Sequence, residues 1–153
     1  MTSQSTFANA IQIRTATPSD AQTIYNFLCE LEEIELDQTA FYTIYQQNLV
    51  NPAIYYLVAE RYDEVVGFVS CHAQYLLHHC GKVGEIQELY VRPDARNQRI
   101  GQALVAELSA LAVREKFINL EVTTNQKRLD TVRFYEREFF NKTHIKLVKP
   151  IQF

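Results

Sequence analysis

The sequence has no long apolar stretch. A helix that crosses a lipid bilayer needs about 20 consecutive apolar residues, and no run in this chain approaches that length. Residues 1–6 are polar and lack the positively charged and apolar regions of a signal peptide. We therefore expect a cytoplasmic protein with no membrane partner.

Cysteine is scarce, and a strong excess of charge of either sign is absent. The three cysteines, Cys29, Cys71 and Cys80, are odd in number and lack the spacing of metal ligands. We therefore expect reduced thiols, two of them in the core. The formal net charge is −3, which argues against nucleic acid or an anionic membrane as the main partner.

The 153 residues contain no repeat, linker or low-complexity segment and are enough for one domain. The apolar pattern predicts a mixed α/β domain over residues 11–153, after a short polar extension at 1–10. Thr17 and Pro18 suit the start of the first helix, whose apolar face would reach Ile34. Strands are expected at residues 11–15, 54–60, 65–76, 83–91, 119–122 and 144–148, and helices at 18–34, 39–50, 100–116 and from about 130.

A strand-forming run that ends at Val91 is followed by an arginine-rich loop and then by a helix. Pro93 stops the strand, and apolar residues from Ile100 onwards recur at helical spacing. The free N–H groups and positive dipole end of this helix are flanked by cationic side chains, which predicts a site for phosphate or pyrophosphate. Gly101 lies in the first turn, where a missing side chain lets a ligand approach the backbone.

Two segments in this order resemble motifs of the GNAT N-acetyltransferases. The loop at residues 96–103 is similar to the loop with which that family binds acetyl-CoA. The Phe134-Tyr135 pair is similar to a pair on a later helix of the family, where the tyrosine serves the departing thiolate. The chain departs from the family at Arg99 and Phe139, which stand at positions that usually hold glycine.

Within that family the chain most resembles the bacterial aminoalkylphosphonate N-acetyltransferases, from about residue 11 to residue 148. The matching segments are Glu30-Leu-Glu, Ala40-Phe, Leu77-His-His, Gly84-Glu-Ile-Gln-Glu-Leu, Asn125, Lys127-Arg and Asp130. The resemblance implies a single-domain GNAT fold, with a mixed, mostly antiparallel twisted sheet that is flanked by about four helices and splayed at the acetyl-CoA site. It also implies acetyl transfer from acetyl-CoA to the primary amine of a small aminophosphonate.

The resemblance also implies which residues bind the cofactor. Backbone groups of Leu89 and Val91 would hold the pantetheine arm like an added strand, and one of their N–H groups would hold the acetyl oxygen. Asn125 would contact the same arm, although a simple turn residue fits its position equally well. The full set of expected cofactor contacts is Leu89, Tyr90, Val91, Arg96, Asn97, Gln98, Arg99, Ile100, Gly101, Gln102, Ala103, Asn125 and Tyr135.

Acetyl transfer needs a base, because a free alkylamine has a pKa of about 10 and is protonated at neutral pH. Alternation along the strand places Glu85 and Glu88 on opposite faces. Alignment on the cofactor loop favours Glu85 as the base, and Glu88 would replace it if a β-bulge reorders the faces. Either residue could instead be an exposed glutamate of the strand. Tyr135 is expected to protonate the departing thiolate.

An anionic acceptor would also need cations. Lys127 and Arg128 precede the helix that carries Tyr135, and His78 lies before the strand that carries Glu85. Each of these three residues would otherwise be an ordinary solvated side chain.

An acidic series lies along the last part of the first helix and just beyond it, and allows other interpretations. It fits the exposed face of that helix, and it could instead bind a polycationic amine or hold a divalent ion. The family's histidine pair is replaced by Asp37-Gln38-Thr39, so the metal ligands stay unknown. A polyamine or other small amine as acceptor, a non-catalytic CoA-binding module and a homodimer remain open. The acidic series comprises Glu30, Glu32, Glu33, Glu35 and Asp37.

Overall fold

The structure, a computed structural model, describes residues 10–153; residues 1–9 of the expected polar extension lie outside the described part. The helices are α1 (Ala21–Glu32), α2 (Gln38–Leu49), α3 (Ile100–Arg114) and α4 (Leu129–Arg137). The strands are β1 (Gln12–Thr15), β2 (Ile54–Arg61), β3 (Glu64–Leu76), β4 (Gly81–Val91) and β5 (Asn119–Val122). Short 3₁₀ turns occupy Pro18–Asp20, Leu77–His79 and Pro93–Ala95.

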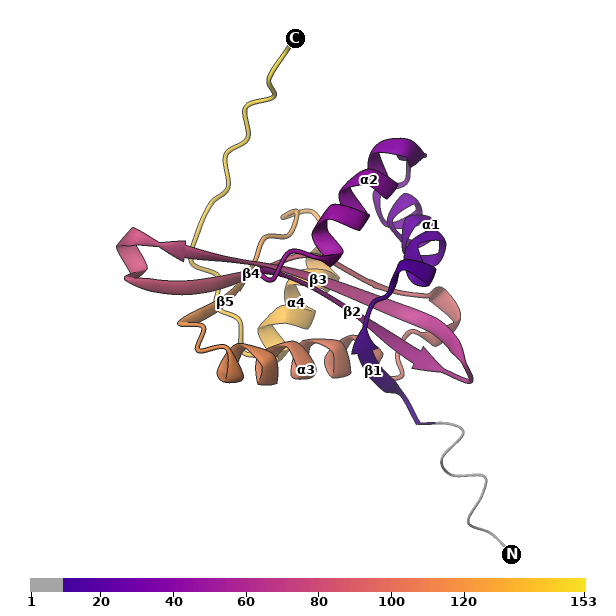
Figure 1. Ribbon diagram of the computed structural model, residues 1–153. Helices are drawn as coiled ribbons and strands as arrows, with labels where there is room; N and C mark the ends of the chain where they lie inside the picture. The colour runs from indigo at the N-terminus through magenta and orange to yellow at the C-terminus, as the bar shows by residue number, and fades with distance from the viewer. Residues whose placement is uncertain (1–9) are drawn as a thin grey trace, which may run out of the picture.

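The strands form one sheet in the order β1-β2-β3-β4-β5. Neighbouring strands from β1 to β4 are antiparallel, whereas β4 and β5 are parallel. Figure 1 shows α1 and α2 on one face of the sheet and α3 and α4 on the other. The mixed α/β sandwich that the sequence predicts is therefore confirmed.

Two apolar clusters join the helices to the sheet. Leu104 and Leu108 of α3 pack with Val69 of β3 on one face. Phe27 of α1 packs with Phe68 of β3 on the other face. Because side chains alternate along a strand, adjacent residues of β3 contribute to opposite clusters. The sheet is thus covered on both faces, and its core residues fix which side each strand position faces.

The pairing of β3 with β4 is interrupted by one β-bulge. Ser70 pairs with Glu88, and the next residue of β3 pairs with Ile86, so Gln87 has no partner in β3. One extra residue shifts the alternation of faces along the strand that contains it. Ile86 lies in the cluster under α3, whereas both Glu85 and Glu88 face the side of α1 and α2. Regular alternation, which would put the two glutamates on opposite faces, is therefore wrong, and the alternative of a β-bulge that reorders the faces is confirmed.

The structure corrects two expected elements. α1 ends at Glu32, and Glu33 takes the left-handed conformation with a φ of 56°. Ile34 consequently lies outside the apolar face and is 59% exposed. Residues 144–148 form no strand and are exposed throughout. Their alternating pattern is suited to a strand, but a strand forms only where a neighbour accepts and donates its backbone hydrogen bonds.

The structure also shows where the three cysteines lie. Cys71 is buried, Cys29 is half-buried and Cys80 is exposed, so the core holds one cysteine fewer than expected. Burial, together with the nearby Glu85 carboxylate, raises the pKa of the Cys71 thiol to about 12. Within residues 10–153, no helix has the length and apolar character that crossing a membrane requires.

The C-terminal end of α4 is closed by Phe139 in a left-handed conformation. Phe139 has a φ of 69°, and its N–H donates to the Glu136 carbonyl at 3.1 Å. The N–H of Phe140 donates to the Tyr135 carbonyl at 3.0 Å, and its ring packs on the Tyr135 ring with centroids 5.3 Å apart. These bonds form a Schellman motif, in which glycine is the favoured residue at the left-handed position. The phenylalanine therefore makes the turn that a glycine would make.

We predict that Phe139→Gly raises the free energy of unfolding by about 1 kcal/mol, because the relieved left-handed strain exceeds the entropy cost of glycine. The ring is 91% exposed and contributes little packing. Thermal unfolding should show a melting temperature higher by about 2–4 °C. As a control, Glu136→Gly in the same helix should lower stability by about 1 kcal/mol. A destabilised Phe139→Gly variant would contradict the role assigned to this backbone conformation.

Candidate active site

The sheet opens between β4 and β5. The two strands pair only from Val83 with Asn119 to Ile86 with Val122, and β5 ends there. β4 continues to Val91 and from Gln87 onwards pairs with β3 alone. The opening begins at the β-bulge, and one edge of β4 is free along it.

Backbone groups of Leu89 and Val91 face this open edge. The N–H of Arg92 donates to Val66 of β3 at 2.8 Å, and the N–H of Glu88 donates to Ser70 Oγ of β3 at 3.0 Å. Peptide groups alternate in direction along a strand, so the N–H groups of Leu89 and Val91 point away from β3. The open edge therefore offers donors to an extended ligand. Its last acceptor, the Val91 carbonyl, receives the Arg96 Nε at 2.9 Å.

The loop between β4 and α3 delivers the free amides at the start of α3. Arg99 precedes the helix with a φ of 64° and makes no side-chain cap. The N–H groups of Ile100, Gly101 and Gln102 in the first turn have no acceptor within the helix, which makes them an anion site together with the helix dipole. Arg99 is thus left-handed at the position where the resembling family has glycine. This conformation costs a residue other than glycine about 1–2 kcal/mol of strain, and Arg99 adopts it nonetheless.

Several loop side chains are engaged within the loop itself. Arg92 pairs with Asp94 at 2.6 Å, and Gln98 donates to the Asp94 carbonyl at 3.2 Å. The guanidinium of Arg96 lies over the Tyr90 ring, 5.5 Å from its centroid. The Arg99 guanidinium has no ion-pair partner among residues 10–153 and is exposed beside the first turn of α3. Among the expected cofactor contacts, Arg99 is therefore the cation most readily available to an anion.

Phe134 of α4 covers the first turn of α3. A Cβ added at Gly101 would lie 3.4 Å from the Phe134 ring and 3.8 Å from Val91, which are ordinary contact distances. Packing within the protein therefore does not require glycine at this position. The absence of a side chain leaves the amides of the first turn accessible from outside.

Tyr135 lies next to Phe134 and is almost fully buried in the cluster under α3. Its hydroxyl has no hydrogen-bond partner in the described part of the chain. Burial raises the pKa of the Tyr135 hydroxyl above its usual range. The group therefore keeps its proton at neutral pH and is available as a donor.

Glu88 is held by Ser70, a residue that the sequence-based prediction missed. The Ser70 hydroxyl donates to the Glu88 carboxylate and accepts the Glu88 N–H at 3.0 Å. Ser70 is fully buried. A single serine inside the apolar run at residues 65–71 was the available signal, because a buried hydroxyl needs a partner.

Glu85 faces the same side as Glu88 but lies outside the opening. It pairs with Glu121 where β4 and β5 still form a ladder, and its carboxylate accepts the Thr123 hydroxyl at 3.3 Å. Glu88 lies beyond the last paired residue and next to Leu89. The free edge of β4 is therefore adjacent to Glu88, and Glu85 is separated from it by the bulge.

The loop after β5 closes one side of the opening. Asn125 Oδ1 accepts the Lys127 N–H at 2.9 Å, and the Arg128 N–H donates to the Asn125 carbonyl at 2.9 Å. The Asn125 side chain thus builds the turn that starts α4. The Arg128 guanidinium reaches the Leu31 carbonyl at the end of α1, at 3.4 Å. Lys127 and Arg128 are exposed at this rim.

His78 does not join these residues. It lies in the Leu77–His79 turn at the start of β4, on the order of 20 Å along the strand from Glu88. Figure 1 shows this turn at the opposite end of the sheet from the loop that leads to α3. Closeness in sequence to the strand of Glu85 therefore does not place His78 near the opening.

Acidic residues in the last turn of α1 and just after it line an open hollow that includes Glu30, Glu33 and Glu35. Glu30 is not simply solvated, because its carboxylate accepts the Tyr90 hydroxyl. Burial and this carboxylate raise the pKa of Tyr90 to about 12. Within residues 10–153, no three His, Cys, Asp or Glu side chains converge as metal ligands do, so no reaction step is assigned to a metal ion.

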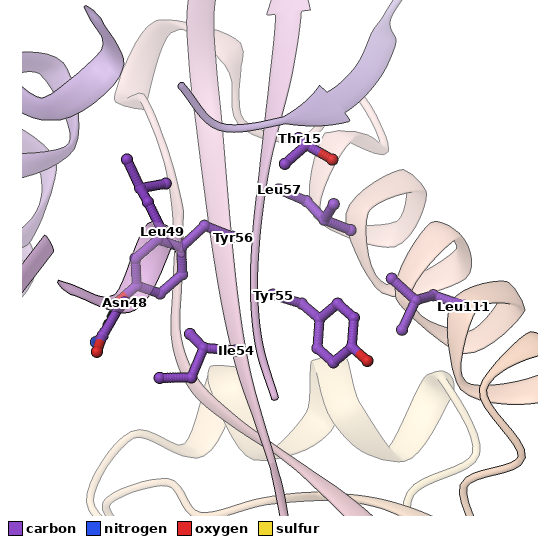
Figure 2. Close-up of a pocket in the computed structure, with 8 residues that line it drawn as sticks. All are labelled: Thr15, Asn48, Leu49, Ile54, Tyr55, Tyr56, Leu57 and Leu111. Atoms are coloured by element: carbon purple, nitrogen blue, oxygen red, sulfur yellow. Dashed lines mark hydrogen bonds between the residues drawn. The ribbon is translucent and has the colours of Figure 1, made fainter. Parts of the chain in front are cut away.

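A second pocket, of about 80 Å³, lies beside β2 where β1 has ended. Figure 2 shows Tyr55 pointing towards Leu111 of α3, and Tyr56 pointing towards Asn48 and Leu49 of α2. Its volume is far below the roughly 300 Å³ of small ligand sites. We therefore regard it as a packing gap between the two faces.

Comparisons with known proteins agree with this geometry. The model of the acetyltransferase (GNAT) family matches residues 21–139. A related protein, the aminoalkylphosphonate N-acetyltransferase of Salmonella typhimurium, is 41% identical over 140 residues, which cover 92% of this chain and 91% of that protein.

Two solved structures share the fold. A transcriptional regulator from Bacillus halodurans has a TM-score of 0.86 at 22% identity and covers 93% of this chain and 100% of its own. A possible acetyltransferase from Clostridium difficile has a TM-score of 0.81 at 21% identity and covers 94% of this chain and 98% of its own. The splayed mixed sheet expected from the sequence is thereby confirmed.

We predict that Gly101→Ala separates folding from ligand binding. Alanine fits the space and favours the helix by about 1 kcal/mol, so thermal stability should rise. Its methyl group covers the first-turn amides, so acetyl-CoA should bind about tenfold more weakly by calorimetry, a loss of about 1.4 kcal/mol. Ser109→Ala, farther along α3, is the control and should leave binding unchanged. Unchanged affinity in Gly101→Ala would remove the first turn of α3 from the binding site.

Proposed function

Because this chain belongs to the acetyltransferase (GNAT) family, we propose that it transfers the acetyl group of acetyl-CoA directly to the primary amine of an aminoalkylphosphonate. The observation that carries the proposal is the free edge of β4 beside the open first turn of α3. The N–H groups on the free edge of β4 suit an extended thioester arm, and those in the first turn of α3 suit a pyrophosphate. The choice of acceptor is supported by 41% identity to the Salmonella enzyme of that name.

In this proposal the cofactor lies along the opening. The N–H groups of Leu89 and Val91 bind the pantetheine arm, and the amides of residues 100–102 with Arg99 bind the pyrophosphate. As the amine attacks, the thioester oxygen becomes an oxyanion, and a backbone N–H on the free edge stabilises it. Asn125 contributes to the cofactor site through the turn that it forms. Its side-chain oxygen already accepts the Lys127 N–H and is not used for the cofactor.

Glu88 is our choice for the base. An alkylammonium must lose a proton before its nitrogen can attack the thioester carbon. Glu88 lies at the start of the opening, beside Leu89, and Ser70 fixes its carboxylate. Glu85 lies in the paired part of the ladder, which makes it the weaker candidate. The base accepts the amine proton directly or through one water molecule.

Tyr135 serves the departing thiolate. Coenzyme A leaves as a thiolate whose conjugate thiol has a pKa of about 8.5. The buried Tyr135 hydroxyl is a weaker acid than that thiol, since burial raises its pKa. Its first contribution is therefore a hydrogen bond to the developing negative charge. The sulfur then takes the proton of the Tyr135 hydroxyl, and the phenolate regains a proton from water.

The acceptor enters from the side of α1 and α2. Lys127 and Arg128 at the rim would bind an anionic phosphonate, Arg128 with a two-pronged geometry. We do not assign His78 to the acceptor site, because it lies far from Glu88 along β4. The hollow with Glu30, Glu33 and Glu35 favours a polyamine as the second candidate acceptor. A divalent ion, the cytoplasmic location and a homodimer stay predictions.

A panel of amines assayed by release of free thiol tests the choice of acceptor. We predict that aminoalkylphosphonates are acetylated with a kcat/KM at least tenfold above that of the matching unsubstituted alkylamines and of polyamines. The expected reason is the ion pair with Arg128, so Arg128→Ala should abolish the preference by raising KM. Equal rates on phosphonates and plain amines would defeat the phosphonate assignment. Activity on no amine would defeat the enzymatic assignment.

The role of Glu88 predicts a specific pattern among three variants. Glu88→Gln should lower kcat by roughly 10²–10³-fold, while the matched Glu85→Gln variant stays within about threefold of the parent. Ser70→Ala should lower kcat by roughly 3- to 10-fold without changing KM for acetyl-CoA.

A double variant tests whether Ser70 acts through Glu88. Ser70→Ala added to Glu88→Gln should cause no further loss, because the group that it positions is already gone. If the losses in kcat of the two single variants add up in the double variant, Ser70 acts through a group other than Glu88. A large loss in Glu85→Gln with an active Glu88→Gln variant would move the base to Glu85.

Removal of the Tyr135 hydroxyl tests whether this residue acts as the proton donor to the thiolate. Tyr135→Phe should lower kcat by roughly 10- to 100-fold, the value of one hydrogen bond to a charged group. Acetyl-CoA binding by calorimetry should survive, since the ring keeps its packing. Tyr45→Phe, which also removes a hydroxyl from a buried tyrosine, is the control and should leave kcat unchanged. Full turnover in Tyr135→Phe would exclude the proposed role.

A further inference from the structure

The loop that leads from β4 to α3 follows an irregular path, so its position depends on side-chain contacts. Residues 96–99 belong to neither a helix nor a strand. Asn97 and Arg99 are both left-handed, with φ values of 59° and 64°. Arg61 of β2 donates to the side-chain oxygen of Gln98 and tethers the loop to the β2–β3 hairpin. A second tether runs from the loop to α1.

The second tether is a chain of three side chains, those of Glu30, Tyr90 and Arg96. The Tyr90 hydroxyl donates to the carboxylate of Glu30, which lies in the last turn of α1. The Arg96 guanidinium lies over the Tyr90 ring, 5.5 Å from its centroid. The Nε of Arg96 donates to the Val91 carbonyl at 2.9 Å. A carboxylate of α1 is therefore linked through one aromatic ring to the guanidinium that caps the end of β4.

Tyr90 is well suited to be the middle member of this chain. It is buried, and its ring packs on Phe27 of α1 with centroids 4.8 Å apart. Burial and the Glu30 carboxylate raise the pKa of Tyr90 to about 12, whereas the Arg96 charge opposes the rise. The hydroxyl therefore keeps its proton at neutral pH and can donate it to Glu30. The ring presents its face to Arg96, and a cation is attracted to such a face.

Arg96 lies at the junction between the two sets of donors that would hold the cofactor. The Val91 carbonyl, which it occupies, is the last acceptor on the free edge of β4. The N–H groups of Leu89 and Val91 lie on one side of this junction, and the first-turn amides of α3 lie on the other. A single extended cofactor must reach both sets. A fixed junction raises its affinity, because a preorganised site has less conformational freedom to lose on binding.

We propose that Glu30 is a positioning residue for the cofactor, which holds the Tyr90 hydroxyl and thereby keeps Arg96 at the junction between β4 and the loop to α3. The inference rests on the proposed function in one respect, which is that acetyl-CoA is the ligand. Glu30 is anionic, as the cofactor is, so a direct effect of its charge would weaken binding. Its effect through Tyr90 strengthens binding. The two effects have opposite signs and can be separated by experiment.

Calorimetry with acetyl-CoA tests the sign of the effect. Glu30→Ala should raise the Kd about fivefold because Tyr90 loses its acceptor, whereas Glu30→Gln keeps an acceptor oxygen and should stay within about twofold of the parent. Tyr90→Phe should match Glu30→Ala, and the two changes together should cause no further loss. Glu32→Ala, which removes a charge from the same turn of α1, is the control and should leave the Kd unchanged.

A nitrogen-15 spectrum of the cofactor-free protein reports on Arg96 directly. The Nε–H of Arg96 exchanges slowly with water while it is bonded to Val91. Its signal should therefore be present in the parent and in Glu30→Gln, and weakened in Glu30→Ala. Glu30 is exposed, so all its variants should fold as the parent does, and thermal unfolding checks this.

Unchanged or tighter binding of acetyl-CoA by Glu30→Ala would overturn the positioning role, and so would an unchanged Arg96 signal in that variant. Equal losses in Glu30→Ala and Glu32→Ala would also overturn it, since the effect would then not pass through Tyr90. A parent chain that binds acetyl-CoA but acetylates no amine would defeat the proposed function and leave this inference standing. A parent chain that does not bind acetyl-CoA would defeat both.

Discussion

The extra residue Gln87 in β4 determines which side chains face the proposed transfer site. If side chains alternated regularly through Gln87, Glu88 would share the side of Ile86, which is packed under α3. With the bulge, Glu88 points to the side of α1 and α2, and the ladder between β4 and β5 ends just before it. One irregularity of pairing thus opens the sheet, frees the backbone of Leu89 and turns a carboxylate towards the opening. β-Bulges often redirect a side chain beside an active site in this way.

Two left-handed residues keep the rest of the site in place. Arg99 starts α3 and Phe139 ends α4 at positions where the family usually has glycine. Both keep the positive φ that glycine adopts without strain. In this chain both residues therefore make the left-handed turn that glycine favours. Arg99 even adds a cation at the helix start, which suits the pyrophosphate of a cofactor.

The sequence predicted much of this arrangement because local patterns specify it. Helical spacing after Ile100 and the break at Pro93 are enough to place the loop and the α3 N-terminus. The sequence raised the possibility of a β-bulge but could not decide to which side Glu88 points, because the bulge depends on pairing with Ser70 in another strand. Residues 144–148 have the local pattern of a strand but need a partner outside their own segment. His78 was misplaced since nearness in sequence is no measure of distance along an extended strand.

The most direct test of this account is a crystal structure of the protein with coenzyme A bound. The account predicts that the arm lies along β4, bonded to Leu89 and Val91, with its sulfur near the Tyr135 hydroxyl and closer to Glu88 than to Glu85. The diphosphate should contact the amides at the start of α3. Coenzyme A bound elsewhere, or a sulfur beside Glu85 with Glu88 turned away, would contradict it.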